Sequence, residues 1–150
     1  MSAETDLIKL YSGRILSLAA DIPRTGRLPA PGATVTRRSP LCGSTVTVDL
    51  SMQDGRVSDY AQDVKACALG QAAAAVVGAQ VIGRSPAELT EAAANLRAML
   101  KDGAEAPAAP WDGFEVLSPA REYRNRHASI LLAIEAAAEA AQIADARRSA

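Results

Sequence analysis

The sequence predicts an α+β domain in which helices cover one face of a small three-stranded antiparallel sheet. Three observations lead to this prediction. Apolar residues recur at helical spacing near both ends of the chain, a region between them alternates strictly, and an Asp-Gly turn signal divides that region. The 150 residues are expected to form a single domain spanning 1–150, since domains most often contain about 100–150 residues.

The N-terminal half is predicted to contain one helix and all three strands. Residues 4–20 have apolar side chains at helical spacing, and the Pro- and Gly-rich stretch 23–32 is expected to be a loop. Val46, Val48 and Leu50 share one face of the middle strand, so the opposite face of the sheet is expected to be wet. The strands are predicted at residues 34–38, 44–51 and 56–64, with the hairpin turn at Asp54-Gly55.

The C-terminal half is predicted to be helical, and its many alanines (33 in the whole chain) should let helices approach closely. Ser85-Pro86-Ala87-Glu88 is a capping box with proline at the first helical position. Trp111 and Phe114 are expected to hold the Pro- and Ala-rich loop 104–113 against the body. The helices are predicted at residues 68–82, about 86–100 and 118–145. The inward face of the second is predicted to be Leu89, Ala92, Leu96, Met99 and Leu100.

Charge and composition exclude several classes of function. Lys and Arg number 16 against 17 acidic residues, so the net charge of −1 gives no electrostatic reason to expect nucleic acid or a membrane as a partner. No secretory signal pattern is visible, and two cysteines cannot form a disulfide framework, so a cytoplasmic location is expected. No Ser/His/Asp arrangement, phosphate loop or carboxylate pair suggests catalysis. The protein is therefore not expected to be an enzyme.

The candidate metal ligands are Cys42, Cys67 and His127. Cys42 lies in a loop that enters the middle strand, and Cys67 lies where the third strand passes into a helix. The hairpin between them should bring both thiols to one end of the sheet. A helix N-terminus and Lys65 would both stabilise a thiolate at Cys67. Two thiols and an imidazole would supply three of the four ligands of a tetrahedral soft-metal site.

Each candidate also has a simpler interpretation. Cys67 can equally be a small apolar residue among alanines, because cysteine is one of the most buried residue types. His127 faces the interior side of the last helix, where a lone histidine is usually satisfied by hydrogen bonds. Arg121, Arg124 and Arg126 nearby are interpreted as a solvated helix start, with an interaction patch as the alternative.

Five segments carry a family resemblance, and two of them contain the cysteines. Ser39-Pro40-Leu41-Cys42-Gly43-Ser44 is similar to Asn-Pro-x-Cys-Gly-Asp, and Val64-Lys65-Ala66-Cys67 lies where Gly-x-Gly-Cys is expected. In this order and spacing they resemble the iron–sulfur cluster scaffold family of IscU, SufU and the N-terminal domain of NifU, over residues 5–145. The other matching segments are Ile22-Pro23-Arg24-Thr25-Gly26, Asp54-Gly55-Arg56-Val57-Ser58-Asp59 and the Gly83/Pro86/Glu88 stretch, with Pro119-Ala120-Arg121 resembling the start of the last segment.

The chain departs from the family pattern at two positions. Residue 44 is Ser where the family has Asp, and the family's third cysteine is missing. Its equivalent is His127, Ala128 or Ser129. The downstream Leu132 and Ile134 favour Ser129, whereas helical facing favours His127.

The resemblance implies a scaffold that binds iron or an iron–sulfur cluster through Cys42, Cys67 and His127 and passes it to recipient proteins. A cysteine desulfurase is the implied partner that supplies sulfur. Two alternatives stay open. The protein is a zinc-bound or degenerate paralogue, or it accepts persulfide sulfur from the desulfurase or regulates it.

Overall fold

The computed structural model describes residues 11–40 and 43–149 of the chain. Its strands are β1 (Ala33–Arg38), β2 (Thr45–Gln53) and β3 (Arg56–Lys65), which form an antiparallel sheet in the order β1-β2-β3. The helices are α2 (Gly13–Ala20), α3 (Ala68–Gln80), α4 (Pro86–Lys101), the 3₁₀ helix η1 (Asp112–Glu122) and α5 (Arg124–Ser149). The predicted α+β class and three-stranded antiparallel sheet are confirmed.

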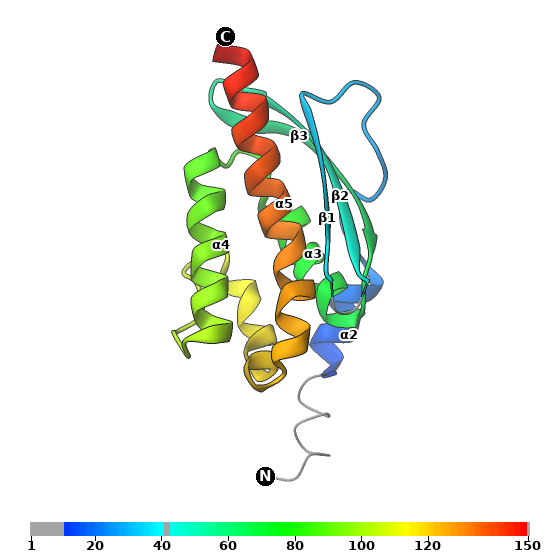
Figure 1. Cartoon of the computed structure of the whole chain (residues 1–150), viewed down its shortest axis with the longest axis vertical. Helices are drawn as coiled ribbons and strands as arrows, with labels where there is room; N and C mark the ends of the chain where they lie inside the picture. Colours follow the sequence, from blue (N-terminus) through cyan, green and yellow to red (C-terminus); the bar gives the residue numbers. More distant parts are fainter. Residues whose placement is uncertain (1–10, 41–42, 150) are drawn as a thin grey trace.

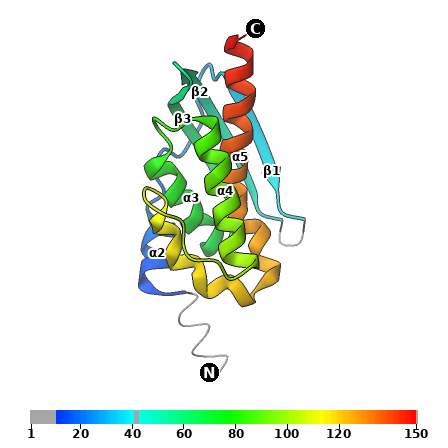
Figure 2. The ribbon, with the colours of Figure 1, turned by 90° about the vertical axis from the view of Figure 1, so that its left-hand side faces the viewer.

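The helices are layered on one face of the sheet (Figures 1 and 2). Helix α5 packs against β1 and β2 on one side and against α4 on the other, and α3 packs beside α5. These interfaces consist largely of small residues, because Ala72 to Ala75 of α3 and Ala136, Ala137, Ala140 and Ala141 of α5 are buried. The helices can therefore approach closely, as the alanine content predicts. Within the described residues, no helix is both long and apolar enough to cross a membrane.

The strand register brings two distant segments to one end of the sheet. Strand β2 pairs with β3 so that Thr45 lies opposite Lys65. At the other end of this hairpin, Asp54 and Gly55 both have positive φ, 54° and 77°, as the predicted Asp-Gly turn requires. The residues just before Thr45 and just after Lys65 therefore lie at the same end of the sheet.

The outer face of the sheet is less exposed than the alternation predicts. Asp49, on that face, is fully buried beneath the loop that follows α2. Its carboxylate accepts hydrogen bonds from Arg27 Nε (2.6 Å), the Leu28 backbone N–H (3.0 Å) and Thr34 Oγ1 (2.6 Å). The prediction of a solvent-exposed face is wrong at Asp49, because Arg27, which lies 22 residues earlier in the chain, covers this part of the strand.

The local helix signals are confirmed most fully in α4. Ser85 Oγ accepts from the Glu88 N–H (3.2 Å), Glu88 Oε1 accepts from the Ser85 N–H (3.2 Å), and Pro86 is the first helical residue. All five predicted inward residues of α4 are buried. Trp111 and Phe114 are buried too, and their rings stack with centroids 6.0 Å apart.

Two helix predictions differ from the structure. The helix predicted over residues 4–20 is interrupted, because Tyr11 and Ser12 are not helical and α2 begins at Gly13, where the Ser12 Oγ accepts a hydrogen bond from the Ile15 N–H. Its predicted start at residue 4 lies outside the described residues. The last helix was expected from residue 118. Instead η1 occupies 112–122, Tyr123 has non-helical ψ of 71°, and α5 begins at Arg124. The predicted loop 104–113 therefore ends at residue 111, two residues earlier than predicted, because η1 begins at Asp112.

Candidate functional site

Cys67 is positioned by the junction between β3 and α3. It is the N-cap residue of α3, with extended backbone angles (φ −68°, ψ 171°), and its side chain makes no capping hydrogen bond. The residue is half-buried and packs partly against the core. The thiol therefore lies where the free backbone N–H groups at the start of α3 point outward.

The residue that reaches the Cys67 sulfur from α5 is Ser129. The Cys67 Sγ lies 3.5 Å from the Ser129 Oγ, and the Ser129 hydroxyl in turn donates to the Ser44 Oγ at 3.0 Å. Since its single proton is used at Ser44, Ser129 accepts from the Cys67 thiol. Both serines are buried. The three side chains therefore form one hydrogen-bonded chain that links α3, α5 and the start of β2.

A glycine in α3 makes room for this contact. A Cβ on Gly70 would lie 2.7 Å from the Ser129 Oγ and 3.2 Å from its carbonyl oxygen. Such separations are shorter than van der Waals contact, so only glycine lets α5 come this close to the first turn of α3. The sequence alone does not indicate that Gly70 belongs to the site. Its role depends on contact with Ser129, which lies 59 positions later, on another helix.

The loop that carries Cys42 connects β1 to β2. Its ends are joined by hydrogen bonds from the Ser39 N–H to the Ser44 carbonyl (2.8 Å) and from the Gly43 N–H to the Ser39 carbonyl (3.1 Å). Gly43 has a positive φ of 72°, which favours glycine. Cys42 itself lies outside the described residues. The prediction that its thiol meets that of Cys67 therefore stays a prediction, while Ser44, two residues later, is linked to Cys67 through Ser129.

His127 lies on a different face of α5 from Ser129. Residues two apart on an α-helix do not face each other. The imidazole is buried, with 2% of its surface exposed, as the helical periodicity predicts. Its Nε2 lies 2.9 Å from the Ala120 carbonyl oxygen, and among the described residues its Nδ1 has no hydrogen-bond partner. The structure thus brings Ser129, rather than His127, into contact with Cys67.

No group of three His, Cys, Asp or Glu side chains suited to a metal ion occurs in residues 11–40 and 43–149. What these residues present at the end of the sheet is one thiol and two hydroxyls. A thiolate is a soft ligand for iron or zinc, whereas a serine hydroxyl is a poor one because it is hardly ionised at neutral pH. The described part of the site can therefore contribute one strong ligand.

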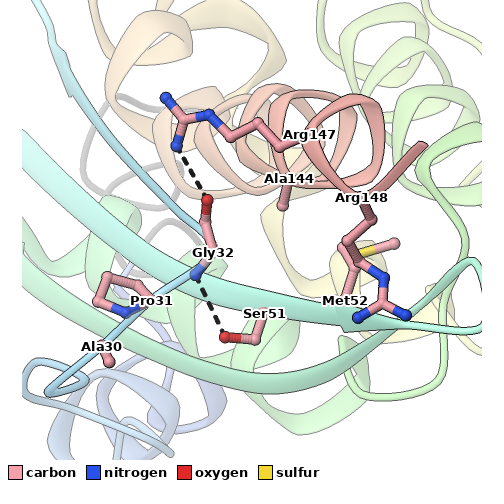
Figure 3. Close-up of a pocket in the computed structure, with 8 residues that line it drawn as sticks. All are labelled: Ala30, Pro31, Gly32, Ser51, Met52, Ala144, Arg147 and Arg148. Carbon is pink, nitrogen blue, oxygen red and sulfur yellow. Dashed lines mark hydrogen bonds between the residues drawn. The ribbon is translucent and has the colours of Figure 1, made fainter. Parts of the chain in front are cut away.

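A separate cavity lies at the far end of α5 and does not include the cysteine site. It has a volume of about 260 Å³, and Gly32, Ser51, Arg147 and Arg148 are among the residues that line it. Figure 3 shows the Arg147 guanidinium directed at the Gly32 carbonyl, to which it donates at 2.9 Å. Gly32 also donates its N–H to the Ser51 Oγ. These contacts fasten the end of α5 to the sheet.

Comparisons with known proteins find similarity among solved structures. No protein-family model matches the sequence, and no curated protein does. Among solved structures, the chain is similar to a nitrogen-fixing NifU-like protein (N-terminal) from Brucella abortus. The two are 42% identical with a TM-score of 0.91, and the match covers 95% of this chain and 99% of that chain.

A second similarity extends the fold to a more distant protein. The chain is similar to a putative iron–sulfur cluster assembly scaffold protein for the SUF system from Fervidobacterium islandicum AW-1. That match has a TM-score of 0.80 at 21% identity, and it covers 89% of this chain and 98% of that chain. This match shows the shared fold, and the 42% identity to the Brucella protein over nearly the whole chain shows that this chain belongs to the NifU/IscU/SufU-like family.

Proposed function

We propose that the protein is an iron–sulfur cluster assembly scaffold that binds iron or a cluster through Cys42 and Cys67 and passes it to recipient proteins. The observation that carries the proposal is the contact of the Cys67 Sγ with Ser129, which in turn bonds Ser44. Position 44 is where the family has its aspartate, and position 129 is one of the three candidates for the place of the family's third cysteine; both are Ser in this chain. Membership of the NifU-like family supports the same function.

The chemistry of the site suits a loosely held cargo. Thiolates are good ligands for iron and for clusters in which sulfide bridges the irons. Because Cys67 is only half-buried, a metal bound to it would be accessible to a recipient protein. With Ser44 and Ser129 in place of a carboxylate and a thiolate, the site carries up to two fewer negative charges. We therefore propose that water or a thiolate of a partner protein completes the coordination.

His127 is the predicted third protein ligand. A metal-ligating histidine usually donates its other ring N–H to a carbonyl or carboxylate. The Nε2 of His127 has such a partner in the Ala120 carbonyl, which leaves Nδ1 as the nitrogen that could bind a metal. The contact of Ser129 with Cys67 favours Ser129 as the residue at the third cysteine's position. The two residues are therefore tested separately.

The experiment is anaerobic reconstitution with iron and sulfide, followed by visible absorption and by counting iron, sulfide and zinc per chain. We expect wild type to bind iron and both Cys42→Ala and Cys67→Ala to lose most of it, with Ser39→Ala as a control in the same loop. Equal, near-zero iron and zinc in wild type and Cys67→Ala would overturn the proposal. Zinc without iron in protein purified anaerobically would instead support the zinc-bound alternative.

Two α5 variants decide the third ligand. If His127 binds the metal, His127→Ala loses iron while Ser129→Ala keeps it. If neither variant loses iron, the protein supplies only the two cysteines. Circular dichroism of each apoprotein shows whether the variant has folded, which matters because both side chains are buried.

Sulfur acceptance from a cysteine desulfurase is a second candidate function, and the N-cap position of Cys67 favours it. In this step the Cys67 thiolate attacks the outer sulfur of the desulfurase persulfide. A new persulfide forms on Cys67, and the desulfurase cysteine leaves as a thiolate, with no net oxidation. Mass spectrometry after incubation with a desulfurase and cysteine should show one added sulfur that Cys67→Ala lacks. If neither Cys42 nor Cys67 carried added sulfur, the result would contradict this function.

A further inference from the structure

A cavity beside the start of α5 is lined almost entirely by basic side chains. It has a volume of about 310 Å³ and lies where the end of α4, the 3₁₀ helix η1 and the first turn of α5 meet. None of its lining residues is acidic, although the chain as a whole has a net charge of −1. They are Leu100, Lys101, Arg121, Arg124 and His127.

The positive charge of this cavity is not neutralised by ion pairs within the described residues. Lys101 and Arg124 form no salt bridge there. The Arg121 guanidinium donates from Nε to the Met99 carbonyl and from a terminal nitrogen to the Ala104 carbonyl, both at 2.8 Å. These neutral partners hold the group in place and leave its charge available. A neighbouring cavity of about 320 Å³ shares Lys101 and Arg124, but there Glu135 also lines the wall and pairs with Arg97.

The buried imidazole of His127 also restricts which hydrogen-bonding groups the ligand must carry. Because the Ala120 carbonyl can only accept, the Nε2 of His127 must be the donor in their 2.9 Å contact. In the neutral ring, Nδ1 is then an acceptor, and it has no partner among the described residues. A ligand that satisfies the whole cavity therefore combines negative oxygens for the cationic side chains with one O–H for Nδ1.

We propose that this cavity binds inorganic phosphate in its hydrogen phosphate form. Arginine and lysine are common partners of phosphate oxygens, and Arg124, the first residue of α5, places the positive end of a 26-residue helix beside the cavity. Hydrogen phosphate carries an O–H at neutral pH, whereas sulfate does not. The site lies on the opposite side of α5 from Ser129, so the proposal does not depend on cluster binding by the cysteines, but it uses the Nδ1 of His127 and therefore excludes that nitrogen as a metal ligand while phosphate is bound.

Isothermal titration calorimetry of the full chain at pH 7.5 and constant ionic strength tests the proposal. We expect phosphate to bind about tenfold or more tightly than sulfate, the ratio that one net hydrogen bond supplies. O-Phosphoserine, which at this pH has mostly lost its O–H, should bind more weakly than free phosphate. Equal binding of sulfate, or tighter binding of phosphoserine, would overturn the assignment.

Exposed variants locate the site without disturbing the core. Lys101→Gln and Arg124→Gln should each weaken phosphate binding about tenfold, because each removes one charge-assisted hydrogen bond. Arg148→Gln removes the same charge at the far end of α5 and should leave the affinity unchanged (Figure 3). Cys67→Ala should bind phosphate as wild type does. An Arg148→Gln effect as large as that of Lys101→Gln would show that general electrostatic attraction, rather than this cavity, holds the anion.

Discussion

The Sγ of Cys67 lies 3.5 Å from the Oγ of Ser129, 62 positions later in the chain. Helices α3 and α5 thus place position 129 beside the thiol, and the group at that position is a neutral hydroxyl.

Ser129→Cys should therefore strengthen metal binding. The new thiol would stand next to Cys67 and could ionise to give a further soft ligand. We expect more iron per chain after anaerobic reconstitution than in wild type, and slower loss of the visible absorption when a chelator is added. His127→Cys is the matched control, since position 127 lies on another face of α5. A larger gain from His127→Cys than from Ser129→Cys would contradict the proposed site.

Gly70→Ala should destabilise the protein by about 1–3 kcal/mol, the usual cost of overpacking. Its Cβ would lie 2.7 Å from the Ser129 Oγ and 2.8 Å from the Ala66 Cβ, so α5 would have to shift. Gly13→Ala is the control, because nothing lies within 4 Å of a Cβ there. The measurement is urea unfolding followed by circular dichroism. Equal midpoints for Gly70→Ala and wild type would mean that α3 and α5 can separate freely at this point.

Asp49→Asn should cost about 1.5–3 kcal/mol at pH 7, the range for hydrogen bonds to charged groups. The hydrogen bonds from the Arg27 guanidinium, above all, hold the pKa of this carboxyl below its ordinary value. A lowered pKa in the folded state stabilises the protein above the ordinary value of about 3.9, and that stabilisation is lost as the pH falls through this region.

The stability difference between wild type and Asp49→Asn should therefore shrink between about pH 5 and pH 3. Urea titrations at several pH values measure it. Glu91→Gln, which removes an exposed carboxylate of α4 without a salt bridge in the described residues, is the control. A difference that grew on acidification would show that the carboxylate does not stabilise the loop in its charged form.

Leu96→Ala should destabilise the protein by about 2–5 kcal/mol, as truncation of a buried leucine does. Leu96 is fully buried on the inward face of α4. Leu16, of which 51% is exposed, provides the same chemical change at the surface and should cost far less. The comparison of the two urea midpoints separates the loss of core packing from a general effect of removing leucine.

The parts of the fold that depend on neighbouring residues were predictable from the sequence. The capping box at Ser85 and Glu88, the Asp54-Gly55 turn and the buried stripe of α4 each need only a few positions to form. The burial of Asp49 and the start of α5 at Arg124 need contacts from elsewhere. Arg27 covers the first, and the second follows η1, whose Arg121 bonds the Met99 and Ala104 carbonyls. No local pattern contains those partners.

Of the candidate site, too, only the part that depends on local sequence was predictable. The antiparallel hairpin follows from the sequence, and its register places Thr45 opposite Lys65, so Ser44 and Cys67 lie at the same end of the sheet. The predicted meeting of the Cys42 and Cys67 thiols stays a prediction. The choice between His127 and Ser129 depends on how α5 is rotated about its axis. That rotation is set by packing, including the fit of Ser129 against Gly70, and a gapped alignment of short motifs carries no information about it.

The bare backbone at position 70 is required by more than one neighbour at the α3–α5 contact. A Cβ there would lie 2.7 Å from the Ser129 Oγ, 2.8 Å from the Ala66 Cβ and 3.2 Å from the Ser129 carbonyl oxygen. Shortening the side chain at position 129 would relieve only the first of these contacts. A glycine at position 70 is therefore needed whichever side chain α5 carries opposite it.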